Sequence, residues 1–368
     1  IDTSKYIDYT IVNPAKLSSS LQFDICRRCH LQGTSVLQNG KNWNDFIPGT
    51  VLSETMDTYI PRYENDESFI MASHVDRLQQ SDCFKVGGVS CISCHNPHKS
   101  VTSLDNNHFN NKCVSCHSNC EETPKNTDCI SCHMPKSSSI DIPHVSITDH
   151  KISVHSNSKK VKGSFKELAC INNDSPTNLS KAKAYLKHYE SFDQNPMLLD
   201  SAFMFLKRCE KEESFPFYIQ YYYLKKDYKK LIKYSEYYSL DKLRNMFTNN
   251  ILSIAYSRIA EAYSKCNFNK KSYANYLKSV ELSPSNLDFL LKTSVLEIKM
   301  FKFEQAKIRL KKMIKLNPNF DKAYYNLGLI YLNVDKDLDI AKLYFEEALK
   351  LNPDYIQAKD MIKYIKSN

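Results

Sequence analysis

The chain has 368 residues, which is enough for two or more domains, and its formal net charge is +9 at pH 7. It contains no run of about 18 or more apolar residues, which excludes a transmembrane helix within it. The charge alone would suit nucleic acid or an anionic membrane, but no basic run is dense enough to indicate either partner.

Composition changes near residue 160. Ten of the eleven histidines precede that point, whereas the later residues are rich in Lys, Tyr and Leu and contain only Gly163 and Gly328 as glycines. The polar and basic stretch 156–163 has no apolar period, which is typical of a boundary. We therefore expect one domain over residues 1–160, a linker over 161–177 and a second domain over 178–368.

Four copies of the pattern Cys-x-x-Cys-His lie within the first 133 residues. This pattern is typical of c-type haem attachment, because two thiols bind the vinyl groups of one porphyrin and the following His ligates its iron. We predict four covalent haem c groups. The predicted thioether cysteines are Cys26, Cys29, Cys91, Cys94, Cys113, Cys116, Cys129 and Cys132, and the proximal ligands are His30, His95, His117 and His133.

Zinc is the main alternative, because two Cys-x-x-Cys pairs can build one tetrahedral thiolate site. A structural zinc site does not need a His after each pair, and here all four pairs have one. A thioredoxin-like redox motif would occur once, beside a βαβ pattern. The repeated His therefore favours haem.

The segment from residue 1 to 155 shows little sustained helical or strand periodicity and many turn-forming residues. Such a segment buries too little apolar surface to offset its chain entropy, so we expect the haems to supply its core. Short helices should surround each motif, with loops elsewhere. The last three motifs begin only 22 and 16 residues apart, which predicts closely packed haems that exchange electrons.

Seven histidines outside the motifs exceed the four that would complete bis-His ligation, the arrangement suited to electron transfer rather than substrate binding. His98 lies three residues after His95, which is too close to round its own macrocycle, so it should ligate a neighbouring haem. His188 is expected on the surface of a helix. The predicted distal ligands are His74, His98, His144 and His150, with His108 in reserve and His155 less favoured.

Five cysteines lie outside the motifs. Two of them, Cys83 and Cys120, fall within the haem region and are either a disulfide pair in an oxidising compartment or two buried thiols. Covalent haem attachment normally takes place outside the cytoplasmic membrane, and a start at Ile1 would fit removal of a signal peptide. Eight propionates would add roughly −8, so the loaded protein should lie near neutrality and nucleic acid is not expected as a partner.

A period of 34 residues marks the second domain. Pro284, Pro318 and Pro353 are 34 and 35 residues apart, and small residues recur at a spacing of 34 up to Gly328. This spacing is typical of tetratricopeptide repeats, in which small residues let paired helices approach and Pro ends the second helix. The last repeat has one extra residue near 335–337, residues 354–367 predict a capping helix, and 178–250 predicts two or three divergent helix pairs.

The run 91–98, the run 129–135, the segment 141–150 and the trailing repeats together resemble a family of exported tetrahaem c-type cytochromes fused to tetratricopeptide repeats. The resemblance implies bis-His haems, a periplasmic or cell-surface location and a role in respiratory electron chains. The expected fold class is mainly α, a loop-rich multihaem domain followed by an α-solenoid.

Three functions fit these features. The first is electron transfer outside the cytoplasm, with the repeats docking the protein to a redox partner or to its own copies. The second is the protomer of an extracellular cytochrome filament. The third is a multihaem reductase or oxidase of a small nitrogen or sulfur compound, which the surplus of His disfavours because it needs an iron without a distal ligand.

Overall fold

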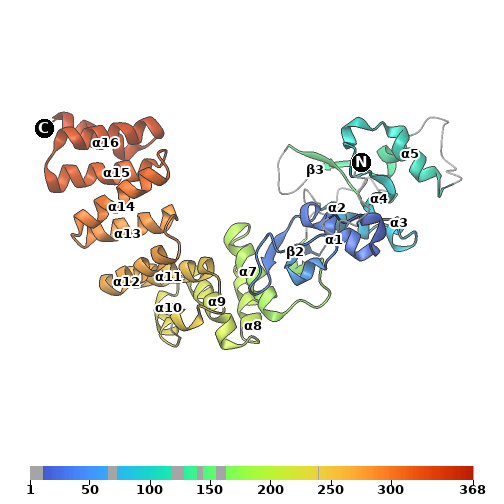
Figure 1. Cartoon of the computed structure of the whole chain (residues 1–368), viewed down its shortest axis with the longest axis horizontal. Coiled ribbons are helices and arrows are strands. Elements are labelled where there is room, and N and C mark those ends of the chain that lie inside the picture. Colours follow the sequence, from blue (N-terminus) through green and yellow to red (C-terminus); the bar gives the residue numbers. More distant parts are fainter. Residues whose placement is uncertain are drawn as a thin grey trace, which may run out of the picture. The chain divides into compact units, whose positions relative to one another are not determined.

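The computed structural model describes residues 11–64, 73–117, 128–138, 144–154, 163–238 and 240–367. The chain is mainly helical and divides into two compact units, unit 1 over residues 1–205 and unit 2 over residues 206–368 (Figure 1). This division lies about 45 residues later than the boundary that composition predicts.

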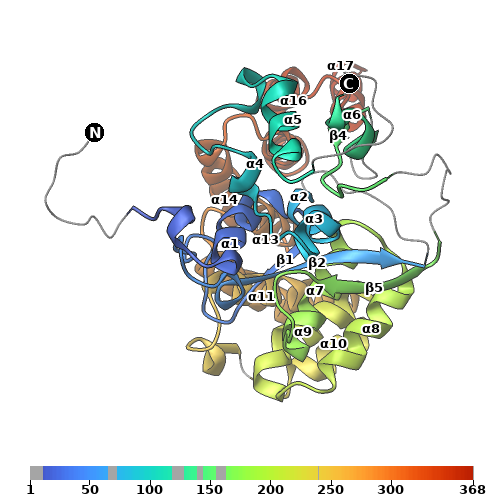
Figure 2. The same ribbon diagram turned by 90° about the vertical axis from the view of Figure 1, so that its right-hand side faces the viewer.

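A three-stranded antiparallel sheet organises unit 1. Its strands are β1 (Thr34–Leu37), β2 (Met56–Tyr63) and β5 (Phe165–Cys170), in the order β1-β2-β5, and Figure 2 shows β2 beside β5. Tyr59 in the central strand is fully buried and pairs with Cys170 across the β2–β5 ladder. The sequence did not predict this sheet.

The expected linker is wrong, because residues 161–177 include β5, which is hydrogen-bonded into the sheet. The helix that follows, α7 (Asn178–Ser191), packs on the sheet and belongs to unit 1. The Tyr59 hydroxyl donates to Ser180 Oγ at 2.9 Å, and the Leu168 amide donates to the Tyr185 hydroxyl at 3.1 Å. These buried bonds fix α7 to strands β2 and β5.

Short helices carry the Cys-x-x-Cys-His motifs, as the sequence predicts. The helices of this part are α1 (Ser19–His30), α2 (His74–Gln79), α3 (Asp82–Lys85), α4 (Cys91–Cys94), α5 (Asn106–Val114) and α6 (Cys129–His133). A second, two-stranded sheet pairs β3 (Lys136–Ser138) with β4 (Ser146–Thr148). The apolar core here is small and consists of Phe23, Val75 and Leu78 with partly buried neighbours that include Cys26 and Cys91.

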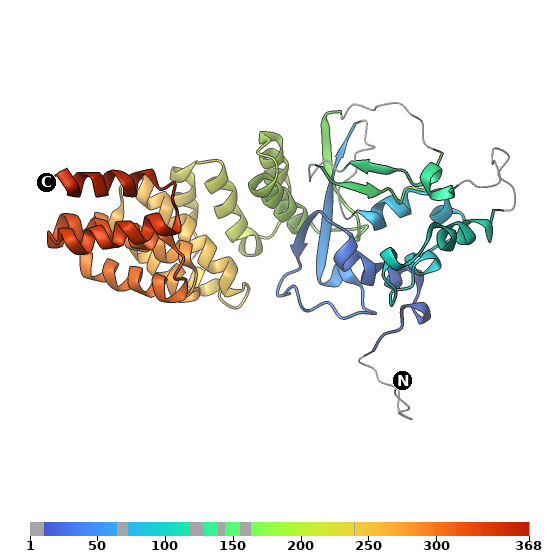
Figure 3. The ribbon, with the colours of Figure 1, turned by 90° about the horizontal axis from the view of Figure 1, so that it is seen from above.

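Unit 2 is a stack of helix pairs, which confirms the predicted repeats (Figure 3). The pairs are α9 (Lys211–Leu224) with α10 (Tyr228–Ser235), α11 (Asn249–Lys265) with α12 (Asn269–Leu282), α13 (Leu287–Lys299) with α14 (Phe303–Leu316), and α15 (Asp321–Ile330) with α16 (Leu338–Leu351). The predicted cap is α17 (Ile356–Ser367), and α8 (Pro196–Leu206) ends unit 1.

The same turn joins the helices of each pair. One residue of every turn is left-handed, with φ of 57° at Lys226, 63° at Asn267 and 59° at both Phe301 and Lys336. The turn at Lys226 therefore identifies α9 and α10 as a repeat, although their sequence diverges from the repeat pattern. In the last repeat a π-helical turn over Tyr331–Asp335 takes up the predicted extra residue.

Gly328 permits the close approach of α15 and α16. A Cβ atom added at Gly328 would lie 2.7 Å from Cε1 of Phe345, whose side chain is fully buried. Gly328→Ala is therefore expected to destabilise unit 2 by about 1–3 kcal/mol, despite the better helix propensity of Ala. Urea unfolding followed by far-UV circular dichroism measures this loss. Lys322→Ala, an exposed change on the same helix, should stay within about 0.5 kcal/mol of the native chain.

Candidate haem-binding region

Each motif lies on one turn of helix. The His95 amide donates to the Cys91 carbonyl at 2.9 Å, the His117 amide donates to the Cys113 carbonyl at 3.0 Å, and α1 and α6 contain their motifs whole. Residues at i, i+3 and i+4 share one helix face. In the first and fourth motifs, which lie wholly within a helix, the two thiols and the imidazole are therefore presented on the same side, as attachment of one porphyrin would require.

The first cysteines of the motifs lie in pairs. A hydrogen bond with Cys91 lowers the pKa of the Cys26 thiol to about 7, and it raises the pKa of Cys91 together with burial. Burial raises the pKa of Cys113 to about 11, with a smaller contribution from its hydrogen bond with Cys129. The first motif is thus beside the second, and the third is beside the fourth.

Four imidazoles form a continuous row, which we call the imidazole row: His30, His74, His150 and His95. Ring centroids are 5.7 Å apart for His30 and His74, 4.6 Å for His74 and His150, and 6.1 Å for His150 and His95. Two members are predicted proximal ligands and two are predicted distal ligands. The fold brings them together from α1, α2, the end of α4 and the segment after β4.

Hydrogen bonds fix the tautomer of two imidazoles. His150 Nδ1 lies 3.1 Å from the Thr148 carbonyl oxygen, and His133 Nδ1 lies 3.3 Å from that of Ser153. A carbonyl oxygen only accepts, so Nδ1 must carry the proton and donate. In the neutral ring Nε2 is then unprotonated, which is the form that ligates a metal.

Burial favours the neutral form of His74 and His150, the two predicted distal ligands in the imidazole row. It lowers the pKa of His150 to about 4, with a smaller contribution from His74, and it lowers the pKa of His74, with smaller contributions from His30 and His95. A neutral imidazole is the ligating form. Among the described residues, buried His74 Nδ1 has no hydrogen-bond partner, so this ring has an unused nitrogen. These features fit an iron ligand.

A buried ion pair holds the middle of the imidazole row. Arg77, three residues after His74 on α2, donates through Nε to Asp149 Oδ1 at 2.8 Å and through Nη2 to Asp149 Oδ2. The two side chains are only 6% and 7% exposed. Asp149 precedes His150, so the Arg77–Asp149 pair joins the segments that contain His74 and His150. The preceding residue of α2, Asp76, accepts from Arg62 Nη2 of β2 at 2.7 Å.

The structure does not gather all of the predicted ligands. His98, His117 and His144 are exposed, and His144 has a φ of 63°. His108 Nε2 lies 3.4 Å from the Cys94 carbonyl, which accepts from it, so the usual ligating nitrogen of this reserve candidate is protonated. Cys120 lies outside the described residues, so the structure does not test the expected Cys83–Cys120 pair. His155 also lies outside them.

The surface position expected for His188 is wrong. Its side chain is buried, and its Nδ1 lies 2.8 Å from Thr34 Oγ1 of β1. The sheet that covers α7 explains the error, because its strands pair across more than 100 residues of sequence. Sequence reasoning also missed Arg77 and Asp149. The sequence feature that could have pointed to them is that each lies within three residues of a candidate His.

Within the described residues, no three or more of His, Cys, Asp and Glu are arranged to hold a metal ion directly. In the same residues, no helix is long and apolar enough to cross a membrane.

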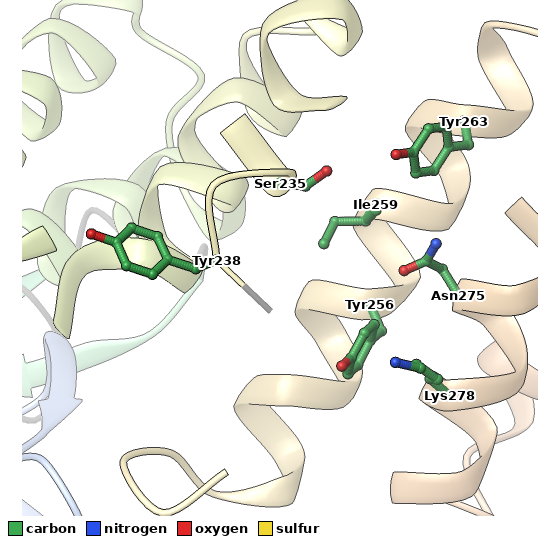
Figure 4. A pocket seen from close by; sticks show the side chains of 7 residues that line it. All are labelled: Ser235, Tyr238, Tyr256, Ile259, Tyr263, Asn275 and Lys278. Carbon is green, nitrogen blue, oxygen red and sulfur yellow. The ribbon is translucent and has the colours of Figure 1, made fainter. Parts of the chain in front are cut away.

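Unit 2 contains a cavity of about 160 Å³ between α10, α11 and α12 (Figure 4). The Lys278 ammonium at its edge is already paired with Asp241, which also accepts from the Tyr256 hydroxyl at 2.9 Å. The cavity is thus small, and its cation is neutralised. Its lining residues are Ser235, Tyr238, Tyr256, Ile259, Tyr263, Asn275 and Lys278.

No family model and no curated protein matches the sequence. Solved structures of tetratricopeptide-repeat proteins are similar to part of the chain. A crystal structure of MamA is 20% identical, with coverage of 45% of this chain and 96% of that one and a TM-score of 0.38. YrrB, described as a repeat protein with an unusual peptide-binding site, is 17% identical over 50% and 92% of the chains, with a TM-score of 0.39. The repeat domain of Arabidopsis OM64 is 21% identical over 32% and 98%, with a TM-score of 0.31.

The tetratricopeptide-like character of unit 2 rests on its own helix pairs, its shared turn and its 34-residue period. Solenoids of this kind offer extended surfaces to other proteins. Unit 2 is therefore suited to docking or assembly.

Proposed function

We propose that the chain is an electron-transfer protein that carries four covalent c-type haems in unit 1 and docks through unit 2. The observation that carries the proposal is the placement of all four Cys-x-x-Cys-His motifs on helical turns, with two of their imidazoles in one row with His74 and His150. When bound, the haems supply one-electron oxidation and reduction of iron.

The spacing of the imidazole row supports a ligand assignment. Two imidazoles could hold one iron between them if their ring centroids lie about 6 Å apart, because a metal–nitrogen bond is about 2 Å. The separations of 5.7 Å for His30 and His74 and 6.1 Å for His95 and His150 fit this arrangement. His74 and His150, at 4.6 Å, are too close to flank one iron. We assign His74 to the first motif and His150 to the second.

His98 and His144 stay the proposed ligands for the third and fourth motifs, because both are exposed and uncommitted to the imidazole row. The Cys113–Cys129 contact supports a second pair of neighbouring sites. A periplasmic or extracellular location belongs to the same proposal, since covalent attachment at eight cysteines takes place outside the cytoplasm.

Haem stoichiometry tests the proposal. The protein produced in a host with a cytochrome c maturation system should have the mass of the chain plus four haems after acid denaturation. Replacing Cys129 and Cys132 together by Ala should remove one haem and leave three. Replacing Cys209 and Cys266 by Ala, in unit 2, should leave all four. A haem-free protein that retains zinc would contradict the proposal.

Spin state separates a carrier from an enzyme. Electron paramagnetic resonance of the oxidised protein should show low-spin signals from all four irons, because each has two imidazole ligands. A persistent high-spin signal from the native protein would identify an open iron and favour the reductase or oxidase.

A further inference from the structure

The net charge of +9 is divided unevenly between the two units. Residues 206–368 carry 30 Lys and Arg against 19 Asp and Glu, whereas residues 1–205 carry 20 against 22. Unit 2 is therefore strongly basic, and unit 1 is slightly acidic before any cofactor is counted.

Within unit 2 the basic excess lies on the second helix of each pair. The helices α10, α12, α14 and α16 together carry 13 basic and five acidic residues, whereas the first helices α9, α11, α13 and α15 carry six of each. Stacked repeats place successive second helices along one side of a solenoid. The positive charge therefore follows one side of the stack.

Six exposed lysines on these helices form what we call the lysine face. Over residues 206–238 and 240–367, none of the six has a carboxylate within ion-pair distance, in contrast to Lys307, Lys342 and Lys350. Like charges at this density repel one another, so the surface is more favourable against an anionic partner. The lysine face consists of Lys229, Lys233, Lys270, Lys311, Lys312 and Lys315.

Unit 1 of a second copy has the matching charge. This step rests on the proposed function. With ferrous irons, eight haem propionates would add a charge of roughly −8 to the two excess carboxylates of unit 1. This total nearly balances the excess of basic over acidic residues in unit 2. We propose that the lysine face of one copy docks on the haem-bearing unit of another. This contact joins different surfaces of the two copies, so it propagates unless rotation closes it into a ring.

Charge reversal on the full-length, haem-loaded protein tests the proposal. Sedimentation velocity at about 20 mM and about 500 mM salt should show association that high salt reverses, because screening shortens from about 20 Å to a few Å. The variant with Lys311→Glu, Lys312→Glu and Lys315→Glu should raise the dissociation constant about tenfold or more. The control variant carries Lys359→Glu, Lys363→Glu and Lys366→Glu on α17, with the same change in charge, and should alter the constant less than about twofold.

The outcomes distinguish this proposal from the proposed function. A protein with four haems by mass that stays monomeric at low salt would overturn the docking and leave electron transfer intact. Equal weakening by both triple variants would indicate unspecific charge attraction and would also overturn it. A chain that takes up no haem would overturn both proposals.

Discussion

Replacing Arg77 by Met is expected to destabilise unit 1 by about 3–5 kcal/mol, because it removes the guanidinium that forms an ion pair with the buried Asp149 carboxylate. Both side chains of the pair are less than a tenth exposed, and two hydrogen bonds join them. The measurement is urea unfolding of the haem-loaded protein followed by Soret absorbance. Removing both charges with Arg77→Met and Asp149→Leu should recover much of the loss, since the buried carboxylate is then removed together with the guanidinium.

The same substitution should also alter ligation. The Arg77–Asp149 pair fixes α2 against the segment of His150, so its loss should broaden the low-spin signals of the two irons assigned to the imidazole row. Arg309→Met is the matched control. It breaks a comparable pair with fully buried Glu297 in unit 2, and it should destabilise that unit without changing the haem spectra. A normal spectrum and normal stability for Arg77→Met would contradict the role of the pair.

Replacing His74 by Ala should convert one of four irons from low spin to high spin, because it removes the imidazole 5.7 Å from His30. All four haems should stay attached, since their thioether cysteines are untouched. His150→Ala should convert a different iron, and the double variant should convert two. Electron paramagnetic resonance gives the count, and mass spectrometry gives the haem number.

His108→Ala provides the control for these variants. The His108 ring donates from Nε2 to a backbone carbonyl, so the four low-spin signals should persist in its absence. High-spin iron in His108→Ala, together with unchanged signals in His74→Ala, would show that the assignment of distal ligands is wrong.

The sequence predicted the parts of the molecule that local patterns encode. The motif spacing placed the thiols and imidazoles on helical turns, and the 34-residue period located the repeats from α11 onwards. His74 is a candidate because it lies in a potentially helical segment before the second motif, and His150 because it lies just after the last motif, among alternating apolar residues. The α9–α10 repeat was visible only in its backbone, through the left-handed conformation of Lys226.

The features that the sequence did not predict depend on contacts between distant residues. Strand β2 is buried along most of its length, so it lacks the alternation that marks a half-exposed strand. Its partner β5 lies about 100 residues away, within the stretch expected to be a linker. The buried position of His188 follows from the same sheet. The net charge of the whole chain likewise did not reveal the difference between the two units, because it does not say where the charged residues lie.

Strands β2 and β5 bring together the two ends of a long segment of the chain. Tyr63 pairs with Phe165, and the Glu64 amide donates to the Ser164 carbonyl at 3.0 Å, so the ends of the intervening segment lie side by side. That segment carries the second, third and fourth motifs, whereas the first precedes β1. It is therefore an insertion with tethered ends, and lengthening such a loop adds little closure entropy. A chain built this way can gain or lose a motif within the insertion while the sheet and α7 keep their places, which would make the number of Cys-x-x-Cys-His motifs a modular property.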